Sequence, residues 1–247
     1  RRRLADGCPG VKAAALEALK GLAAEGCRAT VLAAAPLLAD GDYEVRYAAM
    51  EVLQLLARRG DAAAVAAVAA HLGHCWSDCH RAAVALLQEL VDEGSMPLVL
   101  ARLEDDEPRA RALVLGALRL LAAPGDEATL AAVRARLGDP DDAVRAAALD
   151  TLGRLALAGD CASAAAAAAR LGDTEPYVCQ VAAGAVRRLA RPGDRAAVAA
   201  LLPQLGRGEA ECRGATLRAL GAVAARADEA AVAAVHACLE DGSAEVR

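Results

Sequence analysis

The sequence predicts an all-α fold, a right-handed α-α superhelix of about seven stacked helix pairs with a period near 34 residues. Three observations lead to this fold class. The composition favours helices, a column of residues recurs along the whole chain, and each expected helix carries an apolar stripe. One helix pair cannot bury such a stripe alone, so we expect neighbouring pairs to cover one another.

The composition is apolar without being aromatic. Hydrophobic residues make up 56% of the chain, but aromatic residues only 2%, and Phe is absent. The apolar residues are mostly Ala, Leu and Val, which suit closely packed helices. The formal net charge of −5 argues against a general nucleic-acid binder, which is usually basic. The longest apolar run that we find, the alanines from Ala164 to Ala169, is too short to span a membrane.

Eight cysteines are scattered at positions 8, 27, 75, 79, 161, 179, 212 and 238. A long apolar chain does not need disulfides to be stable, so we expect single cysteines that behave as small buried hydrophobic residues. This usage favours a reducing compartment, and the predicted location is intracellular and cytoplasmic.

The repeat is visible as a column of mostly basic residues. Its eight positions are Lys12, Arg46, His80, Arg111, Arg145, Cys179, Arg213 and Arg247. The step is 34 residues throughout, except for 31 between His80 and Arg111, which places a three-residue deletion between Gly94 and Leu103. Six residues before each position, a second column holds Asp in six of eight cases. We therefore expect a single array over residues 1–247, and the pattern suggests a fragment of a longer array.

Glycines mark the boundaries between helices. The pairs are Gly60-Asp61, Gly94-Ser95, Gly125-Asp126, Gly159-Asp160 and Gly193-Asp194. Gly can end one helix in a left-handed conformation, and Asp or Ser can cap the next. In one repeat this predicts a first helix from Glu127 to Leu137 and a second helix from about Asp142 to Leu157. In the second helix an apolar face is expected from the helical spacing of Val144, Ala148, Leu149, Leu152, Leu155 and Ala156.

The segment 139–149, Asp-Pro-Asp-Asp-Ala-Val-Arg-Ala-Ala-Ala-Leu, resembles the HEAT repeat signature. The short repeat and its small residues are most similar to the phycobilisome-lyase subclass of HEAT-like repeats. The resemblance implies a hydrogen-bonded ladder between neighbouring repeats, with Asp40 and Arg46, Asp105 and Arg111, and Asp139 and Arg145 in that role. The candidate ladder residues are Asp6, Lys12, Asp40, Arg46, Asp105, Arg111, Asp139, Arg145, Asp173, Arg213 and Asp241. The pattern departs at His74, His80, Cys179 and Arg207, where we expect looser or differently bonded stacking.

One short segment has ligands that a metal ion could use. His71, His74, Cys75, Cys79 and His80 lie within ten residues, and tetrahedral zinc accepts such mixtures. Their spacing matches no zinc motif that we recognise. The favoured interpretation is structural, with Cys79 in the core and the two histidines in the ladder columns, and a contact patch around Trp76 is a further alternative. We predict no cofactor, with zinc as the open alternative.

Catalytic motifs are not found. The serines have no Gly-x-Ser-x-Gly context, and the glycines punctuate turns without forming a phosphate loop. Some HEAT-like proteins are di-iron hydroxylases with His-Glu dipeptides, and this sequence has no such dipeptide. The sequence therefore predicts a protein that is not an enzyme.

The remaining place for function is the outward face of the second helices. We expect a non-catalytic scaffold that binds another protein or a peptide segment along the concave helix face. The candidate contact residues are Tyr47, Glu51, Gln54, Trp76, Arg81, Gln88, Arg119, Asp150, Arg154, Gln180, Arg187 and Arg218. The face changes from acidic to basic along the chain, and such a gradient could orient an elongated partner. A merely solvated face is the alternative.

Two other functions fit the sequence less well than the scaffold. The repeat subclass suggests a bilin lyase or isomerase-type subunit acting on a tetrapyrrole, but the chain has few aromatic residues to line such a pocket. Nucleic-acid binding in the manner of HEAT-like glycosylases conflicts with the acidic balance and the single Trp.

Overall fold

The computed structural model describes residues 7–74, 77–206, 209–244 and 246–247, and within these ranges it holds fourteen α-helices and no strand. This confirms the predicted all-α repeat fold. The α-helices are α1 (Pro9–Leu22), α2 (Arg28–Ala34), α3 (Tyr43–Leu56), α4 (Ala62–His71), α5 (Ser77–Leu90), α6 (Met96–Leu100), α7 (Pro108–Leu121), α8 (Glu127–Ala135), α9 (Asp142–Leu155), α10 (Cys161–Ala169), α11 (Pro176–Leu189), α12 (Arg195–Leu201), α13 (Ala210–Val223) and α14 (Glu229–Cys238).

Most of the even-numbered helices end in a tight 3-10 turn. These turns are η2 (Ala35–Ala39), η3 (Leu72–His74), η4 (Ala101–Glu104), η5 (Arg136–Gly138), η6 (Arg170–Gly172) and η7 (Leu202–Gln204). Each even-numbered helix, its turn and the following odd-numbered helix form one repeat, so we call the even-numbered helix the first helix and the odd-numbered helix the second.

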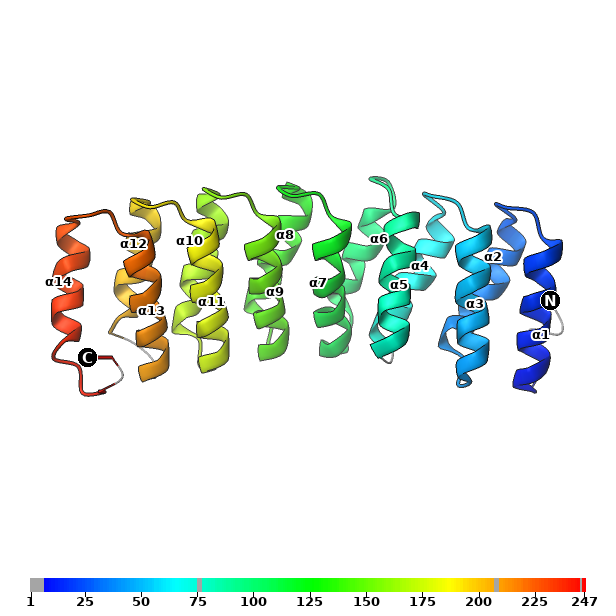
Figure 1. The fold of residues 1–247 in the computed structure, drawn as a ribbon, viewed down its shortest axis with the longest axis horizontal. Coiled ribbons are helices and arrows are strands. Elements are labelled where there is room, and N and C mark those ends of the chain that lie inside the picture. The colour runs from blue at the N-terminus through cyan, green and yellow to red at the C-terminus, as the bar shows by residue number, and fades with distance from the viewer. Residues whose placement is uncertain (1–6, 75–76, 207–208, 245) are drawn as a thin grey trace. The chain divides into compact units, whose positions relative to one another are not determined.

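The chain divides into two compact units, Arg1–Leu121 and Ala122–Arg247. In the first unit the second helices α1, α3, α5 and α7 lie in one layer, with the first helices behind them (Figure 1). In the second unit α9, α11 and α13 form the corresponding layer, and α8, α10 and α12 lie behind (Figure 1). The single array over 1–247 stays a prediction.

The repeat α8–α9 shows why the sequence folds this way. The Asp126 carboxylate accepts the N–H of Thr129 at 3.0 Å and starts α8, and Asp141 accepts the N–H of Val144 at 3.1 Å and starts α9. Both starts lie where the sequence predicts them. Both α-helices end two residues earlier than predicted, because α8 tightens into η5 and the chain becomes extended at Ala156.

The predicted apolar face of α9 is buried. Val144, Ala148, Leu149, Leu152 and Leu155 all lie in the core, while Ala156, which follows the helix, is only partly buried. Burying each of the large side chains contributes about 1.5–3 kcal/mol.

Four of the five predicted boundary glycines have the expected left-handed backbone. They are Gly60 (φ 80°), Gly125 (80°), Gly159 (95°) and Gly193 (84°), and the aspartate after each one caps a helix. Gly94 is the exception, since it is not among the described residues with positive φ. The Ser95 hydroxyl bonds to Asp92 and does not cap α6. The predicted boundary at Gly94-Ser95 is therefore built differently, in the repeat that has lost three residues.

The first helix α14 exposes positions that the other first helices bury. Val232, Val235 and Leu239 are 46%, 38% and 58% exposed. The residues one period earlier, Val198, Leu201 and Leu205, are 5%, 0% and 7% exposed. The difference arises because α12 is covered by α13, whereas no described second helix follows α14.

Candidate protein-interaction face

Arg145 joins two neighbouring repeats of the second unit. From α9 it donates to both carboxylate oxygens of Asp173, at 2.8 Å from Nε and 2.7 Å from Nη2, and Asp173 lies in the turn before α11. Its Nη1 donates to the carbonyl oxygen of Asp139 in its own repeat at 3.0 Å. The two columns thus meet in two ways, through the backbone within a repeat and through side chains between repeats. We call a bond of the second kind a rung.

Rungs recur at other junctions. Arg213 binds Asp241 at 2.8 and 2.7 Å, and Lys12 binds Asp40 at 2.7 Å. Within their own repeats, Arg46 and Arg111 donate to the carbonyl oxygens of Asp40 and Asp105, each at 2.8 Å. Asp6, also predicted for the ladder, lies outside the described residues.

The rungs lower the pKa of their aspartates. Hydrogen bonds from Lys12 and from the Asp42 N–H lower the pKa of Asp40. Burial raises the pKa of Asp173, but hydrogen bonds from Arg145 and the Glu175 N–H outweigh burial, and the pKa falls below its ordinary value. Hydrogen bonds from Arg213 and the Ser243 N–H do the same to Asp241. Each carboxylate is therefore held in its charged form.

Cys179 takes the place of the ladder arginine in α11. It is buried and forms a disulfide with Cys212 of α13. Its Sγ lies 3.4 Å from the carbonyl oxygen of Asp173. In other repeats the equivalent carbonyl oxygen accepts a hydrogen bond from the ladder arginine. The interpretation of all cysteines as single residues is wrong for this pair. The spacing of 33 residues, one short of the period, is the signal that could have shown it.

A second series of bonds, which the sequence analysis missed, fixes the other end of the second helices. In five connectors the glycine at the end donates its N–H to the last carbonyl of the next second helix. The pairs are Gly26–Leu56 (2.7 Å), Gly60–Leu90 (2.7 Å), Gly125–Leu155 (2.8 Å), Gly159–Leu189 (2.6 Å) and Gly193–Val223 (2.7 Å). The glycines therefore also bind neighbouring repeats to one another. Their recurrence at the repeat period is the sequence signal for this second role.

The His/Cys segment is only partly described. His71 is buried at the end of α4, beside a cavity of about 540 Å³, and His80 is half-buried on α5. Burial lowers the pKa of His80. Cys75 and Trp76 lie outside the described residues, as do the side chains of His74 and Cys79. The zinc alternative therefore stays a prediction, which metal analysis of the purified protein can check.

In the first unit the predicted contact residues that the structure describes lie on the second helices. Tyr47 is exposed and stacks on Tyr43 with ring centroids 6.2 Å apart. Glu51 accepts from Lys20 of α1 at 2.8 Å, and Gln88 donates to the carbonyl of Leu120 at 3.3 Å. The other predicted residues here, Gln54, Arg81 and Arg119, are exposed.

In the second unit the predicted residues gather around one carboxylate. Asp150 of α9 accepts from Arg154 on the same helix at 3.1 Å and from Arg188 of α11 at 3.3 Å. Gly153 makes this possible, since a Cβ atom there would lie 3.0 Å from Nε of Arg188 and 3.2 Å from Cα of Ala185. The Arg188 side chain from α11 therefore packs on α9 at a position that has no side chain.

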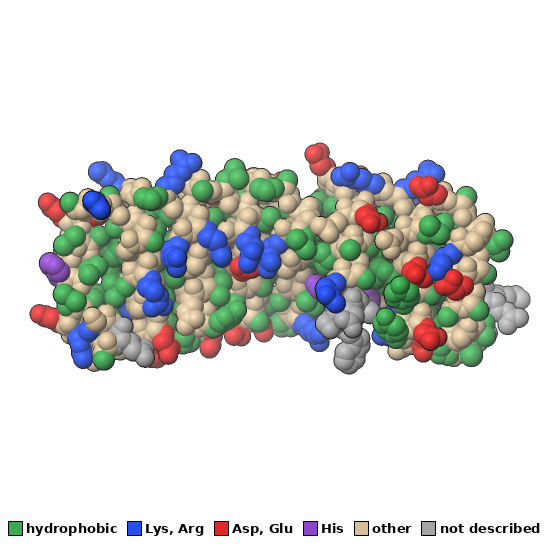
Figure 2. Space-filling model, viewed as in Figure 1, with side chains coloured by type: hydrophobic (Ala, Val, Ile, Leu, Met, Phe, Trp, Pro, Cys, Tyr) green, Lys and Arg blue, Asp and Glu red, His purple; other side chains and the backbone are tan. Residues whose placement is uncertain are grey.

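Further arginines extend this surface. Arg187 of α11 and Arg218 of α13 are exposed, as is Gln180. Lys and Arg side chains form a band over α9, α11 and α13 (Figure 2). We call the surface formed by Arg154, Arg187, Arg188, Arg218 and Asp150 the basic face. It lies wholly within the second unit.

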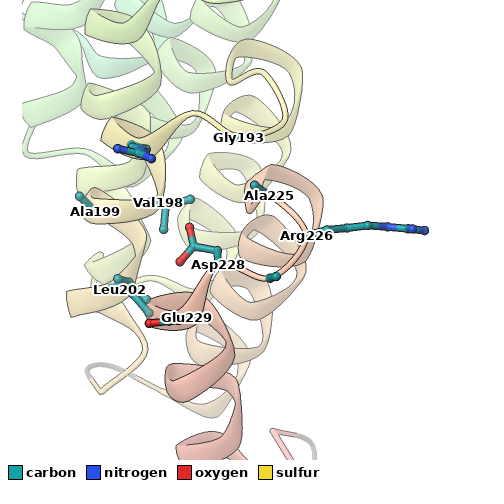
Figure 3. Close-up of a pocket in the computed structure, with 11 residues that line it drawn as sticks. Gly193, Val198, Ala199, Leu202, Ala225, Arg226, Asp228 and Glu229 are labelled. Atoms are coloured by element: carbon teal, nitrogen blue, oxygen red, sulfur yellow. The ribbon is translucent and has the colours of Figure 1, made fainter.

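A separate cavity of about 560 Å³ lies between α12 and the start of α14 (Figure 3). Val198, Leu202 and Asp228 help to line it, and the Arg226 side chain extends away from it. The Asp228 carboxylate caps α14 by accepting the N–H of Ala231 at 3.1 Å. Its acidic group is therefore already used for folding.

None of the described helices is long and apolar enough to cross a membrane. The expected intracellular location stays a prediction.

Comparisons with known proteins do not identify a function. Two crystal structures of engineered proteins, both Northeast Structural Genomics Consortium targets, share 19% and 18% identity with the chain. The first covers 99% of this chain and 74% of its own, with a TM-score of 0.48; the second covers 90% and 94%, with 0.43. Human deoxyhypusine hydroxylase shares 19% identity over 88% of this chain and 92% of its own, with a TM-score of 0.34. These values carry no argument about activity.

No curated protein matches the chain. The family model described as HEAT repeat matches residues 130–158, and this match does not extend to the phycobilisome-lyase subclass. The matched segment holds most of α8, all of α9 and the Arg145 position. Residues 130–158 are therefore similar in sequence to the HEAT repeat.

Proposed function

We propose that this protein is a non-catalytic scaffold that holds a segment of another protein along the outward face of its second helices. One observation carries the proposal. On the outward side of adjacent second helices, charged and polar side chains are exposed on a rigid support. Arg154, Arg187 and Arg218 exemplify this on three successive helices.

The support is rigid for reasons that the contacts explain. In the second unit each second helix is held near its start by an Arg–Asp rung or by the disulfide, and at its end by a glycine N–H. A backbone that is already fixed in this way loses little further entropy on binding, which favours affinity.

Peptide display on the immobilised chain tests the proposal. Selected peptides carrying a photoreactive group should cross-link to second helices, such as α9, α11 or α13. The Gln180→Ala substitution on α11 should weaken peptides that cross-link nearby, and the Ala199→Ser substitution on the first helix α12 is the matched control. Cross-links confined to α8, α10 and α12, or a failure to select any peptide, would contradict a second-helix scaffold.

A further inference from the structure

We propose that the basic face of the second unit binds an acidic segment in extended conformation, laid across α9, α11 and α13. The inference rests on the proposed scaffold function and specifies its partner. It depends on three properties of the face, which are its charge, its prearranged guanidinium groups and its width.

The charge of the face is opposite to that of the whole chain. The face holds four guanidinium groups, on Arg154, Arg187, Arg188 and Arg218, and one carboxylate, that of Asp150, which bonds only to Arg154 and Arg188. The whole chain, in contrast, has a formal net charge of −5. Neither Arg187 nor Arg218 forms an ion pair with any part of the chain that the structure describes. A protein that is acidic overall thus concentrates unneutralised positive charge on one surface.

Two of the guanidinium groups are already positioned. Arg154 and Arg188 are 51% and 44% exposed, yet Asp150 fixes both by hydrogen bonds. Arg188 also lies against Gly153, and a side chain at position 153 would displace the Arg188 guanidinium. A planar guanidinium that still has free N–H groups can bind an incoming carboxylate in a bidentate manner. Asp150 therefore orients the arginines without neutralising them all.

Small residues separate the arginines. Gly184 of α11 and Gly221 of α13 have no heavy atom near where a Cβ would lie, and Gly214 has only Nη1 of Arg218 nearby. The main chain of a partner can therefore approach the helices closely between the charged groups. This arrangement suits an extended segment whose side chains alternate between the surface and solvent.

The width of the face sets the length of the segment. Packed helices are about 8–10 Å apart, so three adjacent second helices span about 16–20 Å. An extended chain covers about 3.3–3.6 Å per residue, so about six residues cross the face. Three or four carboxylates in such a segment would match the four arginines.

The surroundings favour a peptide over a nucleic acid. Glu175 and Glu211, next to or at the starts of α11 and α13, are exposed and add negative charge to the same two helices. A long phosphate backbone would meet these carboxylates, whereas a short segment can avoid them. Single-stranded nucleic acids also use several stacking aromatic residues, and Tyr177 is the only exposed aromatic residue described in the second unit.

Fluorescence anisotropy with a labelled decapeptide that contains six consecutive glutamates tests the inference. We expect binding that weakens as NaCl rises from 0.05 to 0.5 M, an interval chosen to shorten the Debye length severalfold. Reversing charge in the Arg187→Glu, Arg218→Glu double variant should weaken binding by about tenfold or more. Arg195→Glu, Arg226→Glu changes the net charge equally on α12 and the loop before α14, and should leave affinity within about twofold.

The inference fails if both double variants weaken binding equally, if a six-lysine decapeptide binds as tightly, or if the glutamate peptide does not bind. It also fails if a ten-residue oligothymidine binds more tightly than the peptide, because the face would then select phosphate. Peptide display distinguishes this failure from failure of the scaffold. Peptides without acidic residues that cross-link to second helices would refute the acidic partner and keep the scaffold.

Discussion

Arg145 of α9 binds both carboxylate oxygens of Asp173, which lies in the turn before α11, at 2.8 and 2.7 Å. The two side chains are only 11% and 4% exposed. Removing one partner leaves a mostly buried charge without its counter-ion, which costs more than losing a surface pair.

The first prediction concerns this rung. Arg145→Ala should lower the free energy of unfolding by about 2–4 kcal/mol, measured by urea denaturation. Arg154→Ala, which breaks an exposed ion pair with Asp150, should cost no more than about 1 kcal/mol. Equal losses in the two variants would contradict a structural role for the rung.

The second prediction concerns acid. The pKa values of Asp40, Asp173 and Asp241 are lowered by folding, so the rungs stabilise the fold fully above the unfolded-state pKa of about 4. This stability should be lost as the pH falls from about 4 through the lower folded pKa values. Asp173→Asn should be less stable at neutral pH and lose less stability below about pH 4, as urea titrations at each pH would show. A parallel acid dependence in the variant and the native chain would be the contrary result.

The third prediction concerns the disulfide between Cys179 and Cys212. Its loop of 33 residues restricts the unfolded chain, so the oxidised protein should be more stable than the reduced one by about 3–4 kcal/mol. Cys179→Ser should abolish the difference between urea curves with and without reductant. Cys8→Ser removes an exposed cysteine outside this bridge and should preserve the difference. A redox effect that persists in the Cys179→Ser variant would rule out this bridge as its source.

The fourth prediction concerns helix approach. A side chain at Gly153 would press on the backbone of Ala185, so Gly153→Val should destabilise the second unit by about 1–3 kcal/mol. Gly221 occupies the same column in α13 and has free space, so Gly221→Val should change stability by less than about 0.5 kcal/mol. Thermal unfolding of the two variants compares them directly, and the idea does not survive if they shift together.

The fifth prediction compares two leucines at equivalent repeat positions that differ in burial. Leu171 is fully buried, and Leu239, two periods later, is 58% exposed. Leu171→Ala should cost about 2–5 kcal/mol, and Leu239→Ala less than about 1 kcal/mol. Calorimetry of both variants checks this. A large loss for Leu239→Ala would mean that α14 is covered in solution.

Fold class, helix starts and the apolar faces follow from the sequence because they depend on local signals. Asp126 and Asp141 cap helices wherever the chain goes afterwards, and the spacing of Leu149 and Leu152 fixes which side is buried. Helix ends were predicted less well. The tightening into a 3-10 turn at Arg136–Gly138 depends on packing, and the helix propensities of single residues do not predict it.

The rungs were harder to predict than the columns. Arg145 stands six residues from Asp139 and twenty-eight from Asp173, and only stacking of repeats shows that the carboxylate it binds is the distant one. The disulfide was missed for the same reason, because Cys179 and Cys212 become neighbours only across a repeat boundary. Contact residues such as Gln180 can be placed on a face from the sequence, but the sharing of Asp150 by Arg154 and Arg188 needs coordinates.

The connector glycines and the Arg–Asp rungs hold opposite ends of the same second helices. Sliding one helix pair past the next along the helix axis would break bonds at both ends, so that motion is costly. Between these ends the interface consists largely of alanine columns such as Ala148 and Ala182, whose short side chains permit small changes of tilt. Neighbouring helix pairs within a unit should therefore tilt relative to one another without sliding along their axes. The surface under a bound segment would then change its curvature, while the register between its contact points stays constant.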